Sequence, residues 1–313
     1  MRVVPGGHGP ALSVVVVAHE MERELPRTLQ SLATPFQRDI DPDDYEIVVV
    51  DNGSTRALSS VVPADAEASI RLLRIDDAAV SPAQAANVGI ASAGGQLVGL
   101  VIDGARMASP GLLAGARLAA TLAHRPIVTA PAWHLGPTLQ AEAEATGYDR
   151  AQEDALLEAS GWQDDGYALF SIATPAASSA RGLFGAMGES SSLFLHRETW
   201  AELGGLDERF ALPGGGMVNH DLYGRACGLP GAQLVVLLGE GTFHQVHGGA
   251  ATSGRLTRDE MRADYEAIRG EPHRPPSSSA LYVGSVPPSY LPYLAASVEL
   301  AQGASRQPGA GRS

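Results

Sequence analysis

Leu12-Ser-Val-Val-Val-Val-Ala-His-Glu20 is a β-branched run that stops abruptly at polar residues. Tyr45-Glu-Ile-Val-Val-Val-Asp-Asn-Gly-Ser-Thr55 follows the same pattern further along the chain. Short apolar runs of this kind are typical of strands that are buried on both faces, as in a parallel sheet. Their polar ends then meet at one edge of the sheet, which makes the corner from Asp51 to Thr55 a candidate nucleotide contact. A turn that merely ends the strand is an equally good interpretation of this corner alone.

The first 133 residues alternate between apolar runs and segments with helical spacing. The runs lie near residues 12–18, 46–50, 70–75, 96–102 and 127–132. This order predicts an α/β fold with a parallel sheet and crossover helices. Ser81-Pro82 and Ser109-Pro110 each place a capping hydroxyl before a proline, so helices are expected to begin there.

The second half of the chain is less regular. Residues 134–187 mix acidic, aromatic and small residues and are expected to form an insertion or lid with one or two helices. Regular structure is predicted again from Ser190: strands near 190–195 and 233–238, and helices from about 197 and near 220–227. After Gly270 the chain is rich in Pro, Ser and Gly, and its last dozen residues are predicted to be disordered.

Composition excludes several classes of function. The net charge of −13 disfavours nucleic acid and anionic membranes as partners. All 22 basic residues are arginines, which excludes Schiff-base chemistry and a P-loop lysine. Cys227 is the one cysteine, which favours a reducing cytoplasm. Met1-Arg-Val-Val-Pro-Gly-Gly7 does not read as a secretion signal, and no run is apolar enough for a membrane span.

Three further segments carry candidate chemistry. Asp103 directly follows an apolar strand, at the edge where open α/β sheets bind ligands. Asp221 lies at a predicted helix start, where a carboxylate either binds helix N–H groups or faces a ligand. His244 and His247 lie in a Gly-flanked loop and can bind a divalent ion together with a carboxylate. Each residue also has a plain structural explanation, and for His244 a hydrogen-bonded loop histidine is the simpler one.

Taken in this order, the segments resemble the family 2 glycosyltransferases, which have the GT-A fold. The resemblance covers roughly residues 12–110 and 188–250. It implies a GT-A (Rossmann-like) domain over residues 1–270, with a central, mostly parallel sheet flanked by helices. Residues 134–187 are then an inserted acceptor lid, and residues 271–313 an extension.

The resemblance also implies where a nucleotide-diphospho-sugar donor binds. In the family, the polar end of the first strand, here Ala18, His19 and Glu20, and the Asp of the second turn, here Asp51, hold the base and ribose. Asn87 matches the Asn-x-Gly element that leads into the Asp-x-Asp motif.

The family's metal and catalytic positions are matched only in part. Asp103 matches the first acidic position of the Asp-x-Asp motif, but Ala105 replaces the second. Asp103 and His247, the latter within His247-Gly-Gly249, are the implied ligands of Mn²⁺ or Mg²⁺. Arg106 offers another way to neutralise the diphosphate, because guanidinium pairs bidentately with phosphate oxygens.

Asp221 takes the place of the catalytic base, next to His220 where the family has Glu. A base that takes the acceptor's proton in a single displacement inverts the anomeric configuration. The expected activity is therefore inverting transfer of a sugar to a hydroxyl of a small molecule or glycan.

Two other functions compete with this one. A nucleotidyltransferase usually carries a Gly-rich phosphate loop after the first strand, where this chain has Ala18-His-Glu-Met21. A noncatalytic nucleotide-sugar binding protein is suggested by the missing second Asp at Ala105. A homodimer is compatible with the sequence, which does not fix the oligomeric state.

Residues around the insertion offer possible acceptor contacts. Trp133, His134, Trp162 and Tyr167 could stack on sugar rings, although packing of the lid onto the domain is the favoured interpretation. Glu189, before a predicted strand, could touch a donor or acceptor hydroxyl or simply be solvated.

Overall fold

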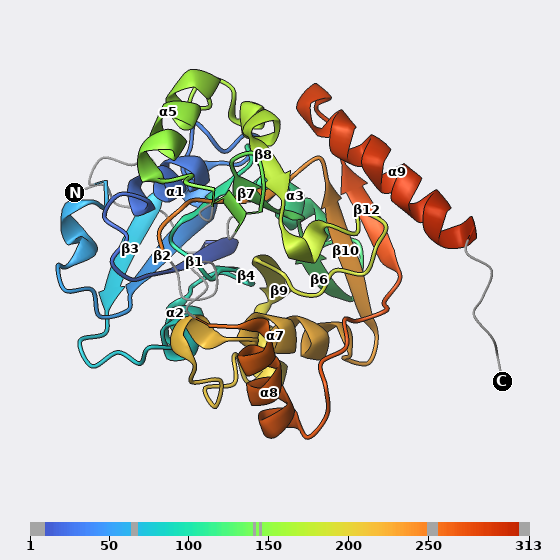
Figure 1. The fold of residues 1–313 in the computed structure, drawn as a ribbon. Helices are drawn as coiled ribbons and strands as arrows, with labels where there is room; N and C mark the ends of the chain where they lie inside the picture. Colours follow the sequence, from blue (N-terminus) through green and yellow to red (C-terminus); the bar gives the residue numbers. More distant parts are fainter. Residues whose placement is uncertain (1–9, 64–67, 140–141, 144–145, 249–255, 307–313) are drawn as a thin grey trace.

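A twisted eight-stranded sheet forms the centre of the computed structural model (Figure 1), which describes residues 10–63, 68–139, 142–143, 146–248 and 256–306. The strand order is β12-β10-β6-β9-β4-β1-β2-β3. The strands are β1 (Leu12–Ala18), β2 (Tyr45–Asp51), β3 (Ser69–Arg74), β4 (Leu97–Val101), β6 (Arg125–Thr129), β9 (Ser192–His196), β10 (Ala232–Leu238) and β12 (Ala280–Gly284). Only β9 runs antiparallel to its neighbours, β4 and β6, so this sheet is mostly parallel as predicted.

A second, smaller sheet lies beyond the carboxyl ends of the parallel strands. Its order is β5-β11-β7-β8, with β5 (Arg106–Ala108), β11 (Thr242–His244), β7 (Ala132–Leu135) and β8 (Ala173–Pro175). The chain enters it from the large sheet, because β5 follows β4 and β11 follows β10.

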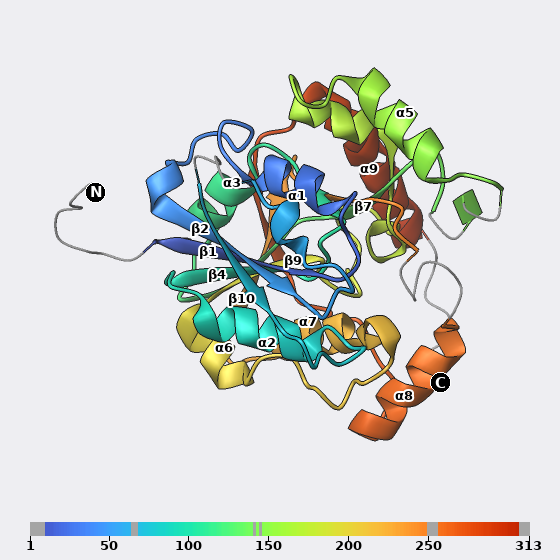
Figure 2. The same cartoon turned by 90° about the vertical axis from the view of Figure 1, so that its left-hand side faces the viewer.

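Helices cover both faces of the large sheet (Figure 2). The helices of the described chain are α1 (Leu25–Leu32), α2 (Ala83–Ser92), α3 (Leu112–Ala119), α5 (Arg150–Ser160), α6 (Arg197–Leu203), α7 (Val218–Cys227), α8 (Arg258–Arg269) and α9 (Leu291–Arg306). Of these, α1 and α3 pack on one face of the large sheet, and α2, α6 and α7 pack on the other. Side chains of β1 alternate between the two faces. Val14 and Val16 belong to the core under α1 and α3, whereas Val15 and Val17 belong to the core under α2, α6 and α7.

Gly89 allows α2 to approach the sheet closely. A Cβ atom at this position would lie 2.9 Å from Cγ2 of Val50 and even closer to Val15. Only glycine fits there without a shift of the helix. This close packing fixes α2 against β1 and β2.

The predicted strands and helix starts agree with the structure, with one correction. Ala83 begins α2, and its N–H donates to the Ser81 hydroxyl (3.3 Å). Ser109 does not cap α3, because its hydroxyl donates to Glu240 (2.5 Å). The Ser109 hydroxyl is therefore bonded to the buried Glu240 carboxylate instead of to the first turn of α3.

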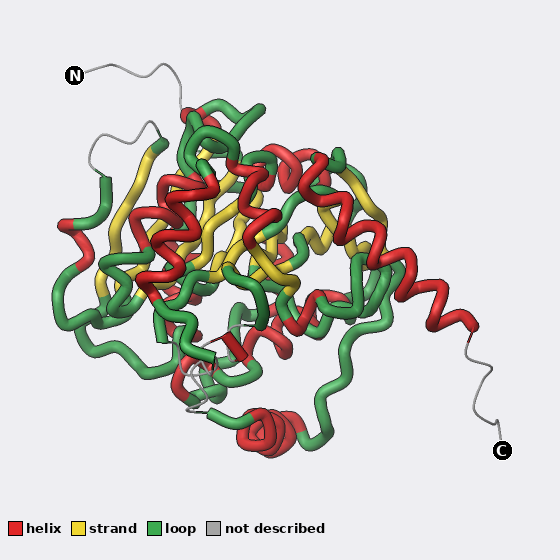
Figure 3. Tube along the Cα trace, turned by 45° about the horizontal axis from the view of Figure 1, so that its top comes forward, coloured by secondary structure: helices red, strands yellow, loops and turns green. Residues whose placement is uncertain are grey.

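The region after residue 270 contributes more regular structure than its composition predicts. β12 pairs in parallel with β10 at the edge of the large sheet, and α9 runs along one side of the molecule (Figure 3). Within the described residues, no helix combines the length and apolarity that crossing a membrane requires. Residues 307–313, within the predicted disordered end, lie outside the described part, as do Met1–Gly7 and Gly249.

Candidate active site

One carboxylate and two imidazoles converge at the carboxyl edge of the large sheet. Asp103 follows β4, His244 ends β11, and His247 lies in the loop after it. Oδ2 of Asp103 is 2.7 Å from Nε2 of His244 and 3.3 Å from Nε2 of His247. The two Nε2 atoms are 3.1 Å apart. Three ligand-type atoms therefore point at a common centre, and we call these residues the Asp103 group.

Electrostatics couple the three side chains. Burial alone would raise the pKa of Asp103, but His247 and His244 outweigh it and hold that pKa well below its usual value. Burial lowers the pKa of His244 to about 4, against the opposing effect of Asp103. Burial also acts to lower the pKa of His247, but Asp103 prevails and raises it. An ionised carboxylate beside a neutral His244 is a suitable ligand pair for a divalent ion.

The donor set fits a transition-metal ion. Ligand atoms of Asp103, His244 and His247 all lie within 4.8 Å of one another. Mg²⁺ prefers oxygen ligands and several waters, whereas imidazole suits transition metals better. Asp103 and His247 were predicted as ligands, but His244 was not; its signal was the spacing of three residues to His247.

Arg106 is a buried cation next to this group. It lies opposite His244 in the β5–β11 ladder. Its Nε and Nη1 atoms are buried and have no hydrogen-bond partner among the described residues. Burial lowers the pKa of Arg106, while the carboxylates of Asp103 and Glu189 act in the opposite direction. Buried N–H groups without a hydrogen-bond partner are costly, so a bound anion would stabilise this arrangement.

Helix α5 of the insertion supports the loop that carries His247. Glu153, fully buried in α5, accepts a hydrogen bond from the Val246 N–H (2.8 Å) and one from Arg23 (3.2 Å). Arg150 donates to the carbonyl of His247 (3.0 Å). The insertion is thus joined to the Asp103 group through backbone contacts that a sequence pattern does not reveal.

The predicted nucleotide corner is held together by its own residues. His19 Nδ1 lies 2.9 Å from the Asn52 carbonyl, and the Glu20 carboxylate accepts from the Thr55 N–H (2.6 Å). Ala18 is buried, and its carbonyl accepts from the Asn52 N–H (2.8 Å). The turn from 52 to 55 therefore lies directly beside the end of β1, as expected.

Asp51 is less accessible than a ligand contact requires. It is fully buried and accepts hydrogen bonds from the Ser54 N–H (2.9 Å) and Arg74 (2.6 Å). Burial acts to raise the pKa of Asp51, but these bonds prevail and lower it. Contact of Asp51 with a nucleotide stays a prediction, and this arrangement tells against it.

The side chain of Asn87 is also hydrogen-bonded to other residues of the protein. Its amide donates to the Leu206 carbonyl (3.0 Å) and to Glu208 (2.9 Å), and its oxygen accepts from the Leu206 N–H (2.8 Å). Asn87 thus ties α2 to the turn after α6. A donor contact by this side chain stays a prediction.

Asp221 lies inside a cluster of arginines. It is 2% exposed, and its two oxygens accept from Arg269 (2.5 and 2.7 Å) and from Arg225 (2.8 Å). Arg269 also pairs with Asp207 (2.9 Å). Guanidinium groups thus occupy both oxygens of this carboxylate, so the geometry tells against Asp221 as the base, which stays a prediction.

The aromatic residues near the insertion pack inward. Trp133 and Trp162 are buried, and Trp133 contacts the rings of Phe170 and Tyr293. The Tyr167 hydroxyl donates to Glu240 (2.8 Å). These three side chains therefore belong to the core and its border.

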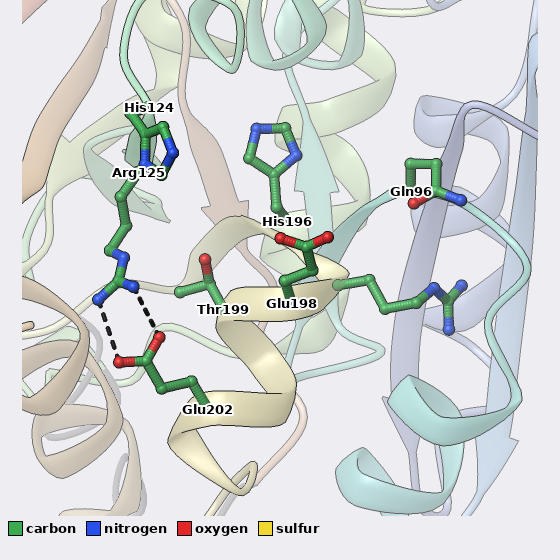
Figure 4. A pocket seen from close by; sticks show the side chains of 8 residues that line it. Gln96, His124, Arg125, His196, Glu198, Thr199 and Glu202 are labelled. Carbon is green, nitrogen blue, oxygen red and sulfur yellow. Dashed lines mark hydrogen bonds and ion pairs between the residues drawn. The ribbon is translucent and has the colours of Figure 1, made fainter.

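A polar pocket of about 320 Å³ lies far from the Asp103 group (Figure 4). It is lined by residues at the opposite ends of β4 and β6, among them Gln96, His124 and Arg125. Arg125 forms an ion pair with Glu202 there (2.8 Å). The converging side chains at the other edge, rather than the residues of this hollow, form the candidate site.

A mostly parallel sheet with these groups at its carboxyl edge defines a glycosyltransferase fold of the GT-A type. The family described as "Glycosyltransferase like family 2" matches residues 13–228, more than half of the chain. The protein belongs to this family. No curated protein matches the chain in sequence.

Solved structures share the fold at low sequence identity. The structure of S. aureus TarS 1-349 in complex with UDP-GlcNAc is 13% identical with a TM-score of 0.52, over 82% of this chain and 66% of that one. The mannosyltransferase PcManGT from Pyrobaculum calidifontis, in complex with GDP-Man and Mn²⁺, is 16% identical with a TM-score of 0.50, over 97% of this chain and 77% of that one. The chain spans less than two thirds of the TarS chains it matches.

Proposed function

We propose that this protein transfers a sugar from a nucleotide-diphospho-sugar to a hydroxyl of a small-molecule or glycan acceptor, with inversion at the anomeric carbon. The observation that carries the proposal is the convergence of Asp103, His244 and His247 beside Arg106, whose Nε and Nη1 atoms have no hydrogen-bond partner in the part of the chain that the structure describes. Departure of a nucleoside diphosphate requires stabilisation of its negative charge, and this site supplies it.

Each group has a distinct task in this proposal. A divalent ion held by Asp103, His244 and His247 would act as a Lewis acid on the diphosphate. Arg106 binds phosphate oxygens and neutralises charge that develops as the bond to the sugar breaks. The turn beside His19 and Glu20 lies at the same edge and is proposed to hold the base and ribose. A cytoplasmic location stays an expectation from cysteine usage.

A thermal-shift experiment tests the donor site. The protein is heated with UDP-GlcNAc, GDP-mannose, dTDP-glucose or CDP-glucose, each with MnCl₂, with MgCl₂ or without metal. A ligand at 100 times its Kd stabilises the native state by about 2.7 kcal/mol, which raises the melting temperature measurably. We expect one nucleotide to act, more strongly with Mn²⁺ than with Mg²⁺. No shift with any donor refutes the proposal.

A noncatalytic nucleotide-sugar binding protein is the second candidate. The pairing of Asp221 with Arg225 and Arg269 favours it, because the expected base is occupied. Release of nucleoside diphosphate from a bound donor separates the two functions. Turnover excludes the binding protein, and binding without turnover supports it.

A further inference from the structure

A histidine–carboxylate pair lies outside the Asp103 group. Nδ1 of His220, at the start of α7, is 3.6 Å from Oε2 of Glu189. Both side chains are 28% exposed. Nδ1 of His220 is buried and has no hydrogen-bond partner in the part of the chain that the structure describes. A small shift would let this N–H donate to Glu189 and fix the tautomer that leaves Nε2 as a proton acceptor.

Sheet register places this pair at the same edge as Asp103. Ser192 of β9 lies opposite Val101 of β4 in the antiparallel ladder. Glu189 precedes that position and Asp103 follows it, so both leave the sheet on the same side. The carboxylates of Asp103 and Glu189 both act on the Arg106 guanidinium. Arg106 therefore lies within reach of both groups.

The neighbouring carboxylate Asp221 is not available for the same task. It is 2% exposed and bound by two arginines, whereas His220 is partly exposed and its Nδ1 makes no hydrogen bond to any described residue. The other groups that face His220 are Glu189 and the ring of His273, whose centroid is 5.2 Å away. Burial and the charge of His220 lower the pKa of His273, whereas Asp221 and Glu189 act in the opposite direction.

We propose that His220 is the general base of the sugar transfer and that Glu189 is the residue that positions it. This inference rests on the glycosyltransferase function proposed above. Nε2 of His220 takes the proton of the acceptor hydroxyl while its oxygen forms a bond to the anomeric carbon. The bond from that carbon to the diphosphate oxygen breaks, and the nucleoside diphosphate leaves with the electron pair. Glu189 stabilises the imidazolium that results.

Hydrolysis of the donor tests the proposal without a known acceptor. Release of UDP from UDP-GlcNAc and of GDP from GDP-mannose is measured with MnCl₂, for the wild type, His220→Gln and Glu189→Gln, and donor binding is measured by calorimetry. We expect His220→Gln to lose turnover roughly 10²–10⁴-fold with donor affinity unchanged. Added imidazole should restore part of the activity of His220→Ala. Glu189→Gln should lower turnover while donor affinity and melting temperature stay unchanged, because the imidazole loses the carboxylate that positions it.

Three results overturn the proposal. Each is judged against the matched control His124→Gln, which should behave as the wild type because His124 is exposed and lies in the polar pocket. Turnover of His220→Gln close to that of this control, from a wild type that is active, overturns the base assignment alone. Loss of donor affinity in parallel with turnover makes His220 a donor ligand instead. A wild type that binds no donor, or binds without turnover, overturns the proposed function together with its base.

Discussion

Replacement of Asp221 by Asn tests whether this carboxylate has a structural or a catalytic role. Asp221 accepts three hydrogen bonds from the guanidinium groups of Arg225 and Arg269. An Asn side chain keeps one oxygen and turns an amide N–H₂ toward donors that it cannot bind. Both arginines then lose the negative charge of Asp221, which is buried between them.

The loss of stability in Asp221→Asn depends on the hydrogen bonds and ion pairs that Arg225 and Arg269 retain. Removal of one partner of a buried ion pair costs about 3–5 kcal/mol. Arg225 still donates to the carbonyls of Leu203 and Gly205, and Arg269 still pairs with Asp207. We therefore expect the lower end, about 3 kcal/mol, which corresponds to a fall in melting temperature of about 5 °C for a chain of 313 residues.

Urea unfolding and thermal melting measure this loss, and donor turnover is followed in the same preparations. Asp259→Asn is the matched control, because its carboxylate is 95% exposed and lies 3.7 Å from Arg262. Its stability should change by less than about 0.5 kcal/mol. The reasoning is refuted if Asp221→Asn melts like the wild type and yet loses turnover by about a hundredfold or more, because Asp221 would then be the base.

Three further changes test the ion site, the sheet and the insertion. Asp103→Asn should abolish the Mn²⁺-dependent part of the thermal shift with a donor; an unchanged metal dependence removes Asp103 from the ion site. In Gly99→Ala the new Cβ would lie 3.3 Å from Cγ of Phe194 and closer to other ring atoms. The free energy of unfolding, measured in urea, should fall by about 1–3 kcal/mol. Gly224→Ala is the control, because its Cβ would meet nothing within 4 Å, and its free energy of unfolding should not fall. Burial raises the pKa of Glu153 from 4.5 to about 6, so the folded chain binds more protons than the unfolded chain in this range and stability falls as pH rises through it. Relative to Glu153→Gln, the free energy of unfolding of the wild type should fall by about 2 kcal/mol as pH rises through the range between those two pKa values. A difference between the two proteins that does not change with pH contradicts the raised pKa of Glu153.

The sequence was sufficient for β1, β2 and β4, because a strand buried on both faces leaves a continuous apolar run. All seven residues of β1 are buried, and so are all seven of β2. Asp103 could be placed at the functional edge for the same reason, since a polar residue directly after such a run must emerge at the carboxyl end.

Partners from distant parts of the chain could not be predicted. His244 joins Asp103 across 141 residues, and Arg269 reaches Asp221 across 48. A sequence pattern gives the type of side chain at a position, but the choice between solvent, protein and ligand depends on what tertiary packing brings beside it. Asp221 was therefore predicted as the base and Asn87 as a donor contact although protein groups bind both side chains, and both roles stay predictions.

The position of β12 sets a limit on where the polypeptide can be shortened. A recombinant fragment that ends at residue 270 would retain β10 with one side of its backbone ladder open, and Val235 and Leu237 of that strand are fully buried in the intact fold. The fragment would also lose Tyr290 and Tyr293, which pack against Trp133. An open, apolar edge strand recruits other chains, so such a fragment is expected to collect in inclusion bodies even though it contains every residue of the Asp103 group.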